Sequence, residues 1–147
     1  MLFRSVRVYK AQVVTLDSAV TNLAKLASHP MLINPGTEAA VIDGLVKTAI
    51  DLDLVDEEAV KKHPRAFDAL KAAVGKLSLE KISEQTGLSR DTFKEIVAIF
   101  AESPRSIILC AEGIVRRTQG YQNVLKLIDF AWITGKDRKS TRLNSSH

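Results

Sequence analysis

The chain has 147 residues, of which 46% are hydrophobic, 26% charged and 5% aromatic, and its formal net charge at pH 7 is +4. This length and composition are typical of one globular domain with a core of its own. The single cysteine, Cys110, excludes an internal disulfide and a cysteine-rich iron–sulfur or zinc site within the sequence, and no apolar run approaches the roughly 20 residues that span a bilayer.

The two ends differ from the rest of the chain. Residues 137–147 (DRKSTRLNSSH) have no apolar period, and residues 1–5 (MLFRS) lack the apolar region of a secretory signal. We expect both to be adapter-derived scars, so that the domain covers 6–136 and its gene continues in both directions. Without their four basic residues and one acidic residue the net charge falls from +4 to +1, so the basic balance does not indicate nucleic-acid binding.

The first half of the chain predicts two strands, each followed by a helix. Residues 6–16 are rich in β-branched side chains and predict a strand that ends at Asp17. A short helix over 21–28 and a short strand over 31–33 follow. The Pro35-Gly36 turn, with Thr37 as the helix N-cap, then begins a helix that reaches residue 52.

The second half predicts a run of helices and then a return to the sheet. The apolar spacing and the breakers predict helices over 56–62, 64–77, 78–86 and 89–102. A continuous apolar run over 106–111, which contains Cys110, predicts a buried parallel strand. A polar loop over 112–120 and a closing helix over 124–133 complete the order. The fold class is therefore α/β: part of a Rossmann-like parallel-sheet domain with a helical insertion.

Polar residues at the predicted strand ends suggest a ligand site, because open α/β sheets bind ligands beyond the carboxyl ends of their strands. Asp17 follows the first strand. The helix after Thr37 offers N–H groups to an anion, and Glu38 in its first turn can accept hydrogen bonds from the N1–H and N2–H₂ edge of guanine. Arg116 and Arg117 suit phosphate. Taken singly, a Gly-Thr-Glu helix start is more often only a cap, and an exposed arginine pair is more often solvated.

Residues 78–101 match the pattern of a helix-turn-helix, with Gly87 in the turn. DNA binding requires cations on and around the second helix. This stretch carries a net charge of −1, from Lys81, Arg90 and Lys94 against Glu80, Glu84, Asp91 and Glu95. A two-helix corner that only packs is the favoured interpretation, and a DNA-binding module is the alternative.

Signatures of a catalytic site are missing from the sequence. His29 and His63 each precede a proline and are expected in loops, and Cys110 is expected to be a buried thiol. There is no Gly-x-Ser-x-Gly, Walker or His-Glu-x-x-His motif. We therefore predict neither a catalytic residue nor a metal ligand in this chain.

Four segments in a fixed order nevertheless resemble the molybdopterin oxidoreductase family, which includes formate dehydrogenases, nitrate reductases and the large iron–sulfur subunit of NADH:quinone oxidoreductase. They are Asp17 with Thr21, the sequence INPGTE over 33–38, the turn GLS over 87–89 and IILCAEG over 107–113. The resemblance runs from about residue 6 to 136. It implies an internal piece of a large subunit, of the NADH:quinone oxidoreductase or formate dehydrogenase-like type.

The resemblance also implies a cofactor site for molybdopterin guanine dinucleotide. Its residues would be Asp17, Ser18 and Thr21 near the nucleotide, Gly36, Thr37 and Glu38 at the guanosine end, and the loop from Gly113 through Arg116 to Gly120 near the pterin or its pyrophosphate. Two departures leave a cofactor-free scaffold of the same fold open. The family's Pro-Arg-Arg after the strand-end acid is replaced by Ser18-Ala19-Val20, and Glu38 replaces the commoner aspartate.

The parent implied by the resemblance moves electrons through iron–sulfur clusters that are bound elsewhere in its chain. Its partners would be the remainder of the same large subunit and the other subunits of an electron-transfer complex, with no nucleic acid and no direct membrane insertion. We expect a cytoplasmic location, peripheral to the inner membrane through partner subunits. The piece alone should be catalytically silent.

Overall fold

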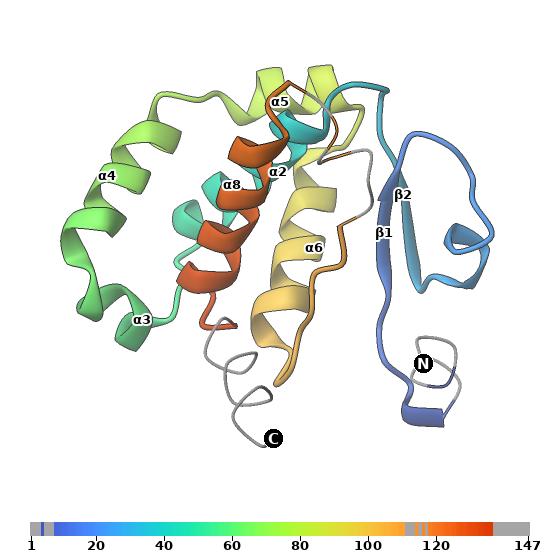
Figure 1. The fold of residues 1–147 in the computed structure, drawn as a ribbon, viewed down its shortest axis with the longest axis horizontal. Helices are drawn as coiled ribbons and strands as arrows, with labels where there is room; N and C mark the ends of the chain where they lie inside the picture. Colours follow the sequence, from blue (N-terminus) through green and yellow to red (C-terminus); the bar gives the residue numbers. More distant parts are fainter. Residues whose placement is uncertain (1–3, 5–7, 111–113, 115, 117, 137–147) are drawn as a thin grey trace.

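The computed structural model (Figure 1) describes residues 4, 8–110, 114, 116 and 118–136. These residues form a small parallel sheet and a larger set of helices. In chain order the elements are strand β1 (Val14–Asp17), the 3₁₀ helix η1 (Ala24–Leu26), strand β2 (His29–Leu32), and helices α2 (Glu38–Asp51), α3 (Glu57–Lys62), α4 (Pro64–Gly75), α5 (Leu79–Thr86), α6 (Arg90–Glu102) and α8 (Gly120–Ile133).

The sheet has two parallel strands, and its register pairs Val14 with His29 and Asp17 with Leu32. One face packs on the helices: Val14 and Met31 lie against the hydrophobic core, and His29 Nδ1 lies 3.0 Å from a carboxylate oxygen of Glu95 on α6. Figure 1 shows the helices on one side of the strands and the η1 connection on the other. The carboxyl ends of both strands therefore meet at one edge, from which the chain continues into α2.

Helix α2 is the centre of the helical part and packs against α4, α5, α6 and α8. Its apolar face meets fully buried side chains such as Phe93 and Ile133. The close approach of α6 depends on Gly44, because a Cβ at this position would lie 2.6 Å from the Phe93 ring. The helices thus supply most of the tightly packed core, and Val14, Met31 and Ile33 pack against it from the sheet side.

The predicted helices between residues 37 and 102 are confirmed, and local capping signals mark the ends of three of them. Asp56, Ser78 and Ser89 each cap a helix by accepting a hydrogen bond from a first-turn backbone N–H. Gly87 ends α5 with φ of 80°, a left-handed conformation that glycine adopts without strain. Capping residues and C-terminal glycines act within a few positions of their helix, so they could be identified without knowledge of the tertiary structure.

The sheet side was predicted less well. Strand β1 begins only at Val14, and Val8 and Tyr9 lie outside it; residues 21–28 form only the short η1. Residues 106–110 form no strand, and Cys110 is exposed rather than buried. The closing helix begins four residues early, at Gly120. An apolar or β-branched run predicts a strand only if a neighbouring strand is present to pair with it, and within the described residues β1 and β2 pair only with each other.

None of the helices formed by the described residues is both long and apolar enough to cross a membrane.

Candidate functional site

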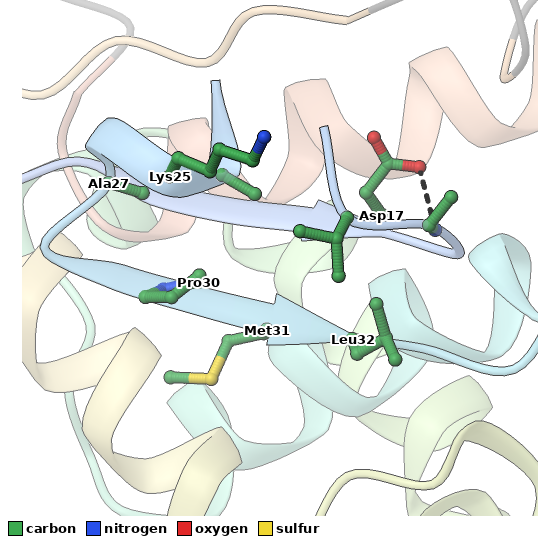
Figure 2. A pocket seen from close by; sticks show the side chains of 9 residues that line it. Asp17, Lys25, Ala27, Pro30, Met31 and Leu32 are labelled. Atoms are coloured by element: carbon green, nitrogen blue, oxygen red, sulfur yellow. Dashed lines mark hydrogen bonds between the residues drawn. The ribbon is translucent and has the colours of Figure 1, made fainter. Parts of the chain in front are cut away.

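The carboxyl end of β1 carries the acid that the sequence singles out. Asp17 is partly buried, and its Oδ1 accepts a hydrogen bond from the Ala19 backbone N–H at 3.4 Å (Figure 2). Its backbone carbonyl accepts a bond from the Ile33 N–H at 2.9 Å, directly before the turn into α2. The parallel register therefore places the residues after β1 beside those after β2.

The start of α2 differs from the predicted cap. Gly36 adopts φ of 82°, and Thr37 occupies the N-cap position. The Thr37 hydroxyl, however, donates to the Asn34 carbonyl at 2.6 Å and makes no capping bond. The predicted side-chain cap is wrong: the Thr37 backbone (φ −104°, ψ 15°) is not in the extended conformation from which an N-cap side chain usually reaches the first-turn N–H groups. Thr37 therefore holds the turn closed and leaves the first-turn N–H groups without a side-chain cap.

Asn34 is a residue that sequence reasoning missed. Its backbone N–H donates to the Thr86 carbonyl at 2.8 Å, and its side-chain amide donates to the Gln85 carbonyl at 3.0 Å. The last turn of α5 is thereby fixed to the loop that begins α2. The Asn-Pro-Gly sequence signals a turn, but nothing local indicates that its asparagine reaches 51 positions along the chain.

A shallow cavity of about 420 Å³ lies between η1 and the sheet, beside Asp17 (Figure 2). Its lining is mostly apolar, with Pro30, Met31 and Leu32 from β2, and two of its lining residues, Asp17 and Lys25, carry charge. Thr21 is not among the lining residues, and its Oγ1 accepts a hydrogen bond from the Ala24 N–H at 3.1 Å at the start of η1. Ser18 is exposed next to Asp17.

The remaining predicted site residues belong to the later loop. Gly113 lies outside the described residues. Arg116 is exposed and takes part in an interaction within the chain, as does Glu38 in the first turn of α2. Gly120 is buried as the first residue of α8. The structure thus brings Asp17 and Ser18 to the same sheet edge as Gly36, Thr37 and Glu38, and makes Thr21 and Gly120 parts of local helix starts.

Residues 78–101 form the expected two-helix corner, but its second helix is a packing element. Phe93, Ile96 and Val97 of α6 are buried in the core. Of its outward charges, Glu95 contacts His29 and Arg90 forms an ion pair with Glu80. A recognition helix needs an accessible basic face. This geometry favours the packing interpretation over DNA binding.

Groups for bond-making chemistry are scarce. Nowhere in the described part of the chain do three His, Cys, Asp or Glu side chains come together as a metal site. Cys110 is exposed, yet partial desolvation raises the pKa of its thiol above the ordinary value. The thiol therefore stays protonated at neutral pH and is a poor nucleophile.

Comparison with known proteins gives consistent relatives, although no family model matches the chain. It is 32% identical to the assimilatory nitrate reductase catalytic subunit of Bacillus subtilis over 86% of its length, and 28% identical to the F420-dependent formate dehydrogenase 2 subunit alpha of Methanococcus maripaludis over 90%. Among solved structures, acetylene hydratase from Pelobacter acetylenicus matches 84% of the chain with a TM-score of 0.76 and 27% identity.

These matches cover only part of each relative. The chain spans 18% of the nitrate reductase subunit, 20% of the formate dehydrogenase subunit and 17% of the acetylene hydratase chain. Its sequence and its fold are therefore similar to those of one segment of these proteins. The mixed α/β class is confirmed, as a mostly helical segment with a two-stranded parallel sheet.

Proposed function

We propose that this chain is a segment of the catalytic subunit of a molybdopterin-family oxidoreductase. The relatives support this family and favour the nitrate reductase and formate dehydrogenase type, while the NADH:quinone oxidoreductase type stays a prediction of the resemblance. When bound, the metal–pterin group supplies the redox chemistry. The segment itself contributes contacts to the guanine dinucleotide arm of that cofactor and no bond-making group.

One observation carries the assignment of the site: Asp17 and the Gly36-Thr37-Glu38 start of α2 leave the same edge of a parallel sheet. The chemistry of this donor set fits a guanine nucleotide in part. Asp17 and Glu38 carry carboxylates that can accept from the guanine edge, and the uncapped first turn of α2 offers backbone N–H groups to the rest of the nucleotide. The Thr21 and Thr37 hydroxyls already have partners within the chain, so these two residues would shape the site rather than bind through their side chains.

The later loop would complete the site. Arg116 suits the pyrophosphate, and Gly113 and Gly120 bound a loop that can approach the pterin closely. Iron–sulfur clusters belong to the rest of the parent, because this sequence contains one cysteine. The parent would work with further subunits of an electron-transfer complex in the cytoplasm. A Rossmann-like sheet would be completed by strands that the parent supplies.

The test is the pterin content of the full-length parent carrying Glu38→Ala. We expect a several-fold loss of bound guanine dinucleotide cofactor, measured by fluorescence of the oxidised pterin, because a hydrogen-bonding acid at the guanosine end is removed. Glu38→Asp, which restores the family's commoner residue, should retain it. Glu102→Ala, at the far end of α6, is the matched control. Unchanged pterin content in Glu38→Ala would remove the guanine-contact role, and a parent without pterin would indicate the cofactor-free scaffold.

A further inference from the structure

The segment 106–110 has the side-chain pattern of a β-strand without being one. Ile107 and Leu109 are 78% and 69% exposed, whereas Ile108 between them packs against the hydrophobic core. The side chains thus alternate between core and solvent with the period of two that defines a strand. Figure 1 shows the segment returning alongside α6, and Ser106 Oγ holds it there by donating to the Phe100 carbonyl at 2.9 Å.

The backbone of this segment also has no partner among the residues that the structure describes. From Ile107 to Cys110 no backbone hydrogen bond joins any residue that the structure describes. Backbone N–H and C=O groups of an apolar segment are seldom left unpaired in a complete fold, and parallel sheets occur with both faces covered. Two large aliphatic side chains in water beside an unpaired backbone indicate a missing neighbour.

We propose that 106–110 is a sheet strand whose hydrogen-bonding partner is an extended apolar segment of the same parent polypeptide, outside residues 1–147. The inference rests on the proposed function, because the segment's relatives are about five times as long as this chain. The partner must supply a row of backbone N–H and C=O groups, and aliphatic side chains that cover Ile107 and Leu109. Main-chain pairing of this kind gives the affinity, and alternate side-chain contacts give the register.

Hydrogen exchange of the chain alone and of the full-length parent tests this pairing. In the chain alone, the Ile107, Ile108 and Leu109 amides should exchange at rates near those of an unfolded peptide. In the parent, at least one of them should slow by about 100-fold or more, because a strand edge protects alternate amides. The Leu45 and Val46 amides of α2 are the internal control and should be protected in both. Equal, fast exchange in both proteins overturns the proposal. Protection that appears in the chain alone as its concentration rises also overturns it, in favour of a second copy.

A charge placed on the exposed side gives a second test. Leu109→Lys should change the Tm of the chain alone by less than about 2 °C, because the side chain is largely in water there. In the parent the same change would bury a lysine and should lower the Tm by at least about 5 °C or abolish soluble expression, while Leu109→Ile should be tolerated. A parent that accepts Leu109→Lys without loss contradicts the proposal.

The two hypotheses can fail separately. A parent that binds pterin but leaves 107–109 unprotected retains the proposed function and loses this inference. A parent that protects these amides but contains no pterin retains this inference and loses the proposed function.

Discussion

The helical part and the sheet part of this molecule differ in how completely they fold on themselves. Around α2, the side chains of Ala49, Phe93, Val97 and Ile133 are fully buried. On the sheet side, Leu32 and Ile107 are 58% and 78% exposed. The helices satisfy their backbone within each element, whereas a strand needs a neighbour. A segment cut from a larger sheet domain is therefore expected to keep its helical core and to leave its strands incomplete.

The candidate site lies on the incomplete side. Asp17 and Glu38 are held by a two-stranded sheet and by the turn that Asn34 fixes to α5. The helical part thus acts as the support, through the link from Asn34 to Gln85 and Thr86, and the sheet edge carries the groups that would meet a ligand. Stability and the proposed cofactor contacts should accordingly respond to different substitutions.

Phe93→Ala and Leu32→Ala form the strongest test of this division. Removal of the fully buried Phe93 ring should lower the free energy of unfolding by about 3–5 kcal/mol, through lost burial and the cavity left behind. Leu32→Ala should lower it by less than about 0.5 kcal/mol, because much of this side chain is already in water. Urea unfolding of the two variants measures both values. Similar losses would show that the sheet part is as fully packed as the helices.

Gly135→Ala tests the point where the end of α8 meets the start of α3. Gly135 has φ of 74°, and a Cβ there would lie 2.3 Å from a carboxylate oxygen of Asp56, the residue that caps α3. Backbone strain and the clash together should cost about 2–4 kcal/mol. Gly75→Ala is the matched control, because nothing lies within 4 Å of its added methyl group, and it should be neutral or slightly stabilising. The Tm values of both variants decide between strain and a general effect of added bulk.

Gly87→Ala tests the link between the two parts. The left-handed conformation at Gly87 should make an alanine cost about 1–2 kcal/mol, and its Cβ would lie 3.2 Å from the Asn34 side-chain oxygen. In an Asn34→Ala background the contact disappears and only the strain remains. The cost of Gly87→Ala should therefore be smaller there, as a double-mutant cycle of unfolding free energies can show. Identical costs in the two backgrounds would mean that the two side chains do not interact.

The sequence predicted most where the signals are local. Ser78, Ser89 and Gly87 mark helix ends through contacts within four positions, and the structure confirms these ends. The run over 106–111 was predicted as a buried strand, but residues 106–110 form none, because a strand requires a neighbour that no local pattern reveals. The role of Asn34 could not be predicted either, since it depends on a contact with α5 far along the chain. Within the site, the location of Asp17 and of the Gly36-Thr37-Glu38 helix start at the ends of the two strands was predictable. The hydrogen-bond partners of the Thr21 and Thr37 hydroxyls were not.

The smallest expected effect concerns Asp129, on α8 at the border of the helical part with water. Partial burial raises the pKa of its carboxyl above the ordinary value, so the folded state binds its proton more tightly than the unfolded chain does. The stability that this proton gives is complete below the unfolded pKa and is lost as pH rises through the raised, folded value. Asp129→Asn should therefore raise the Tm slightly at pH 7, and the gain should shrink toward pH 3. Asp68→Asn, at an exposed site on α4, should not show this pattern. A gain of equal size at both pH values would point to a cause other than the charge, such as altered packing of α8.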